Sequence, residues 1–147
     1  MDAIDRQLLD LLRRSARLSY AELARKVGLS APAVHERVGK LESSGVIRGY
    51  HADVNPDSID LGVTALIRVV HDTSVDIDEL IENVRGLPEI ESCYFLAGEE
   101  SLLLKLRVGT IAELEHLVVQ LGGTPGVANT RTTIALSTKW ESRPRPL

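Results

Sequence analysis

The chain has 147 residues, of which 44% are hydrophobic and 26% charged, as is ordinary for a globular protein of one or two domains. No signal peptide opens it, and no apolar run approaches the roughly 20 residues that a membrane helix needs, so we expect a cytoplasmic protein without membrane contact. Aromatic residues make up only 3% of the chain, too few for a platform that stacks single-stranded bases.

The net charge of −4 is unevenly distributed along the chain. Residues 1–51 hold nine Lys/Arg and six Asp/Glu, a balance of +3, whereas residues 52–147 have a balance of −7. This pattern favours a basic N-terminal part that meets a polyanion, with duplex DNA as the best candidate. Cys93, the single cysteine, excludes an internal disulfide and a cysteine-based zinc site, and its apolar neighbours predict a small core residue.

Two helices are predicted at the start of the chain. The first has one apolar face at helical spacing, formed by Ile4, Leu8, Leu11 and Leu12. The second begins at the capping box formed by Ser19 and Glu22, whose side chains can each bond the other's backbone amide. It ends after about two turns at Gly28, which can adopt a left-handed conformation.

A third helix is predicted from Ser30, its N-cap, to Gly45. A short helix, a tight turn containing glycine and a further helix are typical of the helix-turn-helix, whose second helix lies in the DNA major groove. The first turn of this helix carries only small side chains, so its backbone can approach base edges closely. A plain three-helix domain with solvated charges is the alternative interpretation.

The predicted DNA contacts follow from this geometry. Ala33 could touch a thymine methyl, and His35 and Glu36 could read base edges. Arg37 could pair with guanine or grip phosphate, whereas Lys40 is expected to grip phosphate. The full set of predicted DNA-binding residues is Ser19, Tyr20, Ser30, Ala31, Ala33, His35, Glu36, Arg37, Lys40 and Arg48.

The segment after the third helix alternates loosely and predicts a strand over residues 46–54, followed by a turn-rich link over 55–61. Four strands (63–70, 90–96, 102–108 and 127–136) and two helices (76–85 and 111–121) then follow in the order βαββαβ. Pro88 and Pro125 each follow a helix and open a strand, 37 residues apart, so the two halves repeat. This order predicts a ferredoxin-like antiparallel sheet with helices on one face.

The fold class is therefore α+β, with a winged-helix-like helix-turn-helix domain and a ferredoxin-like domain. The predicted boundaries are 1–51 for DNA binding, 52–61 for a linker strand and turn, and 62–147 for effector binding and oligomerisation. The uncovered sheet face should carry Leu66, Val70 and Leu104 or their neighbours, and an apolar open face of this size predicts a dimer.

Both halves of the chain resemble the Lrp/AsnC, or feast/famine, family of transcription regulators. The resemblance rests on residues 23–30, on the pattern that runs from Val34 to Tyr50, on Gly98 in a loop, and on residues 130–132 opening the last strand. It implies a homodimer that often forms octamers, that binds and bends promoter DNA, and that responds to an amino acid held between dimers. No cofactor is expected beyond that amino-acid effector.

The resemblance places the effector at the loop 97–101. Gly98 lets backbone amides approach a carboxylate, and an acid beside it could hold an ammonium group. Ser101 and Leu102 stand where leucine-responsive members carry an aspartate and an aromatic residue, and the two acids make a basic amino acid a reasonable hypothesis. The predicted effector-binding residues are Gly98, Glu99, Glu100, Ser101, Thr132 and Thr133.

Two other functions compete with a ligand-sensing regulator. An enzyme is disfavoured because the chain has no phosphate-binding loop and no nucleophile elbow, and its four histidines are scattered without metal-ligand spacing. A DNA-binding architectural protein that ignores amino acids remains an alternative, and it predicts DNA affinity that no amino acid changes.

Overall fold

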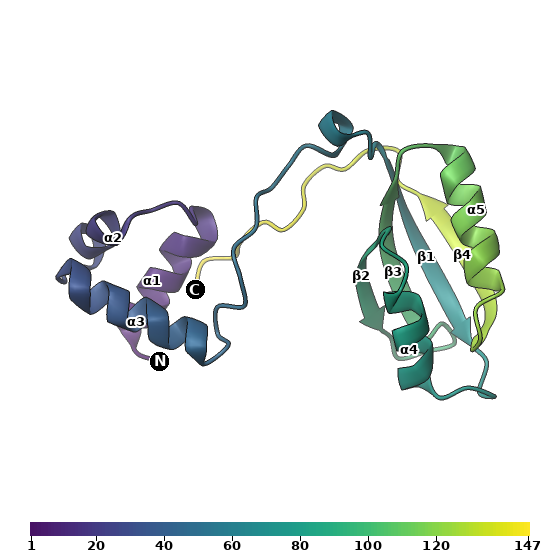
Figure 1. Ribbon diagram of the computed structural model, residues 1–147, viewed down its shortest axis with the longest axis horizontal. Helices are drawn as coiled ribbons and strands as arrows, with labels where there is room; N and C mark the ends of the chain where they lie inside the picture. The colour runs from purple at the N-terminus through teal and green to yellow at the C-terminus, as the bar shows by residue number, and fades with distance from the viewer. The chain divides into compact units, whose positions relative to one another are not determined.

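The computed structural model describes residues 1–147 and divides the chain into two compact units (Figure 1). The helical unit contains Met1–Asp53 together with Trp140–Leu147, and the sheet unit contains Val54–Lys139. The last eight residues therefore differ from the expected boundary, which assigned them to the sheet domain. A contact distant in sequence joins them to the helical unit, because Arg13 Nη1 donates a hydrogen bond of 2.9 Å to the carbonyl oxygen of Arg145.

Three helices form the helical unit, α1 (Ala3–Arg14), α2 (Tyr20–Val27) and α3 (Ala31–Ser43). Apolar side chains from all three meet in one small core, in which burial replaces contact with water and supplies most of the stability. The core residues are Leu8, Leu12, Leu23, Ala24, Val34 and Val38. The predicted helix-turn-helix order is present, with α2 and α3 as its two helices.

Local signals set the ends of these helices as the sequence predicts. Ser19 and Glu22 form a complete capping box at the start of α2. Gly28 ends α2 with φ +72°, a left-handed conformation that glycine adopts without a Cβ penalty. The turn to α3 is therefore tight, and Ser30 caps α3 by accepting a hydrogen bond from the amide of Ala33.

The strand predicted over residues 46–54 is wrong, since the chain there forms no strand. The amide of Ile47 instead donates to the carbonyl of Leu41 (3.0 Å), which ties the start of the segment to the end of α3. The phenol of Tyr50 donates to Glu42 Oε1 at 2.8 Å. Desolvation and this carboxylate raise the pKa of Tyr50 to about 12. The loose alternation of apolar and polar residues in this segment is not enough to form a strand, because a strand needs a neighbouring strand with which to form hydrogen bonds.

The sheet unit has the predicted βαββαβ order after a short 3-10 helix, η1 (Pro56–Ile59). Its four strands form an antiparallel sheet with the spatial order β2-β3-β1-β4, so the two central strands are those that begin each half. The elements are β1 (Val63–His71), α4 (Ile77–Arg85), β2 (Ile90–Phe95), β3 (Leu102–Val108), α5 (Ile111–Gly122) and β4 (Val127–Ile134). No helix in the chain has the length and apolar character needed to cross a membrane.

Alternation along the two central strands places one sheet face under α4 and α5 (Figure 1). The buried face includes Ala65, Ile67 and Val69 of β1, and every second residue of β3 from Leu102 to Val108. Leu80 of α4 and Leu121 of α5 pack on it. The other face is not covered by a helix.

Two sequence expectations about this sheet need correction. Leu104 is fully buried under the helices, so it does not belong to the open face; its neighbour Leu103 does. Leu66 and Val70 lie on the open face as expected, because they alternate with the buried residues of β1. Cys93 is exposed rather than a core residue, because β2 is an edge strand and the helices cover it incompletely. Partial burial still raises the pKa of its thiol.

A turn before β4 provides a test of the packing. Gly126 has φ +89°, and a Cβ there would lie 3.2 Å from the Cβ of Leu80 and 3.3 Å from that of Val75. We expect Gly126→Ala to lower the free energy of unfolding by about 1–3 kcal/mol. Gly122→Ala is the matched control, because its added Cβ meets nothing within 4 Å. Urea unfolding compares the two variants, and equal loss in both would contradict the expectation.

Candidate nucleic-acid interface and effector loop

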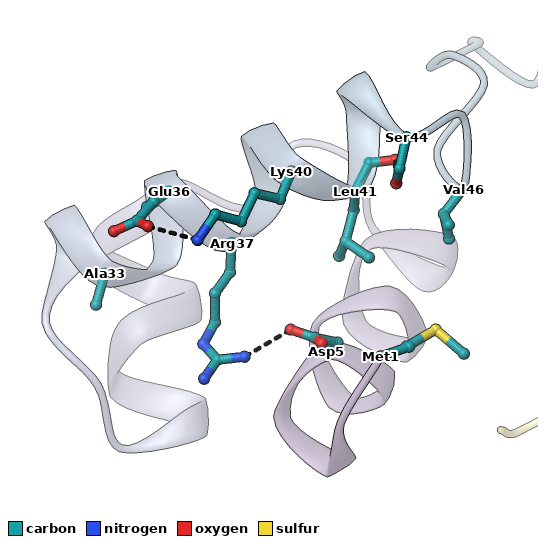
Figure 2. Close-up of a pocket in the computed structure, with 9 residues that line it drawn as sticks. All are labelled: Met1, Asp5, Ala33, Glu36, Arg37, Lys40, Leu41, Ser44 and Val46. Carbon is teal, nitrogen blue, oxygen red and sulfur yellow. Dashed lines mark hydrogen bonds and ion pairs between the residues drawn. The ribbon is translucent and has the colours of Figure 1, made fainter.

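The outward side of α3 carries half of the predicted DNA-binding residues and borders an open pocket of about 560 Å³ (Figure 2). Ala33, Glu36, Arg37 and Lys40 line this pocket, together with residues from the start of α1. Ala31 is the exception, because it is half-buried against the core of the helical unit rather than directed outward. The expectation that Ala31 points outward therefore needs correction, whereas its contact with DNA stays a prediction.

Arg37 is not free on this surface. Its Nη1 lies 2.7 Å from Asp5 Oδ1 (Figure 2) and 2.7 Å from Asp2 Oδ2, so it links α3 to the start of α1. Hydrogen bonds to Asp2 and then to Asp5 raise the pKa of Arg37. The pKa of Asp2 is lowered, first by the backbone amide of Asp5 and then by Arg37. The guanidinium thus has a carboxylate clamp in the absence of DNA.

Lys40 is also paired, since its Nζ lies 2.6 Å from Glu36 Oε1 one helical turn earlier (Figure 2). This pair lowers the pKa of Glu36. Both side chains are mostly exposed, so the pair contributes little to stability and a phosphate can replace the carboxylate. The two predicted bases of α3 therefore each have a competing acid on the same surface.

The N-terminal ends of α2 and α3 bring the other predicted contacts together. The rings of Tyr20 and His35 meet edge to face with centroids 4.8 Å apart, which joins the start of α2 to α3. Ser19 and Ser30 occupy the two N-caps, where exposed amides and the helix dipole favour an anion. Arg48 lies outside the helices, exposed in the segment that follows α3.

Sequence reasoning missed the contribution of α1 to this surface. In the sequence, Asp2 and Asp5 are simply acids that suit the start of a helix, and nothing in their local spacing points to Arg37, 32 or more positions away. The hydrogen bond of Arg13 to the tail was missed for the same reason. Such long-range pairings depend on the packing of α1 on α3.

The predicted effector loop connects β2 and β3 in a hairpin. The amide of Leu96 donates to the carbonyl of Ser101, and the amide of Ser101 donates to the carbonyl of Val69, both at 2.8 Å. Gly98 has φ +139° and no heavy atom within 4 Å of an added Cβ, so the loop exposes backbone there. Glu99 is exposed beside it.

Glu100 is held by two arginines of the sheet. Its carboxylate lies 3.3 Å from Arg131 Nη1 of β4 and 3.9 Å from Arg68 Nε of β1. Arg68 and Arg131 stand directly opposite each other across the two strands, where like charges repel unless an anion lies near them. The negative charge of Glu100 is therefore already balanced by these two arginines. This weakens the argument that Glu100 binds a basic amino acid.

Thr132 and Thr133 of β4 cannot both face the same site in one chain. Thr132 lies opposite the buried Ile67, whereas Thr133 lies opposite Leu66, so their side chains point to different faces of the sheet. The loop is anchored at Val69, three residues from Leu66 along β1, or about 10 Å.

Comparisons with known proteins agree with both units. Residues 1–42 match the model of the AsnC-type helix-turn-helix domain, and residues 63–145 match that of the Lrp/AsnC ligand binding domain. The chain belongs to the Lrp/AsnC family. It is 38% identical over 143 residues to the HTH-type transcriptional regulator LrpA of Mycobacterium tuberculosis, and the aligned region covers 97% of this chain and 95% of that protein.

Two solved structures of Lrp/AsnC-like regulators superpose closely. The feast or famine regulatory protein of M. tuberculosis complexed with L-methionine has a TM-score of 0.93 at 38% identity, covering 99% of each chain. A transcriptional regulator of Neisseria meningitidis in complex with L-methionine has a TM-score of 0.90 at 32% identity, covering 98% of this chain and 96% of that one. This Lrp/AsnC protein is accordingly a DNA-binding transcription regulator and not an enzyme.

The carboxylate clamp on Arg37 gives a testable consequence for this Lrp/AsnC helix-turn-helix. In Asp2→Asn/Asp5→Asn the guanidinium is released towards phosphate, while asparagine still caps α1. We expect tighter DNA binding and a salt dependence of log K steeper by about 1.

Fluorescence anisotropy over a salt series measures both quantities. Asp76→Asn/Asp78→Asn, at the start of α4, makes the same change in net charge away from α3 and is the control. If the two double variants behave alike, the clamp does not restrain Arg37.

Proposed function

We propose that this protein binds promoter DNA sequence-specifically through α3 and that an amino-acid effector, bound at the loop 97–101, modulates this binding. The observation that carries the proposal is the match of one chain to both a DNA-binding and a ligand-binding family model. We further propose that Ala33, His35 and Glu36 contact base edges. Arg37 would contact either a guanine or a phosphate. The residues that would contact the DNA backbone are Ser19, Tyr20, Ser30, Lys40 and Arg48. Such a regulator would act in the cytoplasm, where it can reach the chromosome.

A neutral amino acid such as methionine is the best candidate for the effector. Two similar regulators are described in complex with L-methionine. The ion pairs of Glu100 with Arg68 and Arg131 leave Glu99 as the only loop acid that could hold a cationic side chain. In our proposal Gly98, Glu99 and Ser101 bind the effector's polar groups from one subunit. Only one of Thr132 and Thr133 would contact it from a given subunit, because the two side chains point to opposite faces of the sheet.

A thermal-shift screen against the common amino acids tests the effector proposal. A ligand that binds only the folded state raises the melting temperature by mass action, and we expect methionine to do so more than lysine or arginine. Gly98→Trp should remove this shift while leaving DNA binding intact, since its side chain would fill the exposed loop. A blank screen, repeated with DNA present, would instead favour the ligand-independent architectural protein.

We also propose that the open face of the sheet pairs with a second copy, as part of a homodimer that can assemble into an octamer. Leu66, Val70 and Leu103 are half-buried on a face that no helix covers, and an apolar sheet face is stabilised by a partner.

A charge placed on that face tests the dimer. We expect Leu66→Glu to shift the protein from dimer or octamer towards monomer in analytical ultracentrifugation, because a carboxylate would be desolvated in the interface. Val119→Glu is the matched control, since Val119 is 70% exposed on α5 and away from the open face. An unchanged assembly in Leu66→Glu would place the interface elsewhere.

A further inference from the structure

The end of the chain lies on the helical unit and lines a groove there. Residues 140–144, the end of α1 and residues 46–53 surround about 1260 Å³. Val46 lines both this groove and the pocket beside α3, so the groove begins where α3 ends. The tail therefore adjoins the helix that is expected to enter the major groove.

The groove is rich in arginine. Arg13, Arg14, Arg48 and Arg143 line it together with the acids Asp53 and Glu141, and Arg145 follows in the same tail. Arg14 is paired with Asp10, whereas the salt bridges of the helical unit do not include the other four arginines. Four arginines at the tail groove thus lack a carboxylate partner, whereas Arg37 and Lys40 on α3 both have one.

The sequence of the tail suits an extended arm. In Arg143-Pro144-Arg145-Pro146 each arginine directly precedes a proline, which disfavours helical geometry and favours an extended chain. The main chain of Arg145 is anchored by Arg13, while both arginine side chains are exposed. An anchored backbone with exposed arginines loses less conformational entropy on binding than a free tail would.

We propose that Arg143 and Arg145 form a DNA-binding arm that enters the minor groove of A·T-rich duplex beside the major-groove site of α3. This inference rests on the DNA-binding function of the helical unit and adds a second contact to it. A helix in the major groove has its end near the phosphate backbone, and the next groove across that backbone is the minor one. Narrow A·T minor grooves concentrate negative potential and attract arginine.

The first experiment uses the full chain and a duplex that the wild-type protein selects from a random-sequence pool. We expect Arg143→Ala/Arg145→Ala to weaken binding and to reduce the salt dependence of log K by about 2, one for each arginine. Arg143→Lys/Arg145→Lys should restore the salt dependence. Arg85→Ala, an exposed arginine of α4, is the control for loss of charge.

Base-pair replacement then identifies the groove. An inosine·cytosine pair presents an A·T-like minor groove and a G·C-like major groove, because inosine lacks the N2 amino group of guanine. When flanking A·T pairs are replaced, the wild-type protein should tolerate inosine·cytosine and lose affinity for G·C. The double alanine variant should bind all three flanks alike.

The outcomes separate this inference from the proposed function. If the wild-type protein selects no duplex, the DNA-binding function fails first. If it binds DNA but Arg143→Ala/Arg145→Ala keeps both the salt dependence and the discrimination against G·C flanks, the arm is overturned. A change only in the oligomeric state of that variant would also overturn it, since the tail would then serve contacts between copies.

Discussion

Side chains on neighbouring positions of a strand must point to opposite faces, and the arrangement of the sheet unit depends on this constraint. Once Ala65, Ile67 and Val69 are buried under α4 and α5, Leu66 and Arg68 can only lie on the open face. Residues that pair directly across two strands share a face of the sheet, so the pairing register also fixes the faces of the residues of β3 and β4. It therefore sets both where the core lies and which groups surround the loop 97–101.

The constraint explains which parts of the sheet could be predicted. Helix and strand order follow from local periodicity, and the sequence predicts every α-helix and strand of the sheet unit, though not the 3-10 helix η1. The face of Leu104 was also readable locally, because Leu104 and Leu106 alternate with Lys105 and Arg107 along β3, so its placement on the open face overlooked a signal that the sequence contains. Cys93 was misjudged because an apolar run does not reveal that its strand lies at a sheet edge.

The helical unit shows the same division between local and long-range information. Ser19, Glu22 and Gly28 act within a few residues of one another, so their roles were readable from spacing. The clamp of Asp2 and Asp5 on Arg37 joins two helices, and only their packing reveals it. Counting charges along the sequence correctly found a basic N-terminal part, but the structure shows which of those charges already have partners.

The return of the tail to the helical unit changes how the two units are connected. The sheet unit is an insertion within the helical unit, since the chain leaves the helical unit after Asp53 and re-enters it at Trp140. Both crossings leave the same end of the sheet, where the amide of Ala135 donates to the carbonyl of Thr64 at 2.9 Å. Two separate segments of the chain, rather than one, therefore connect the two units. A change at the base of β1 or β4 thus has two covalent routes to the DNA-binding helices.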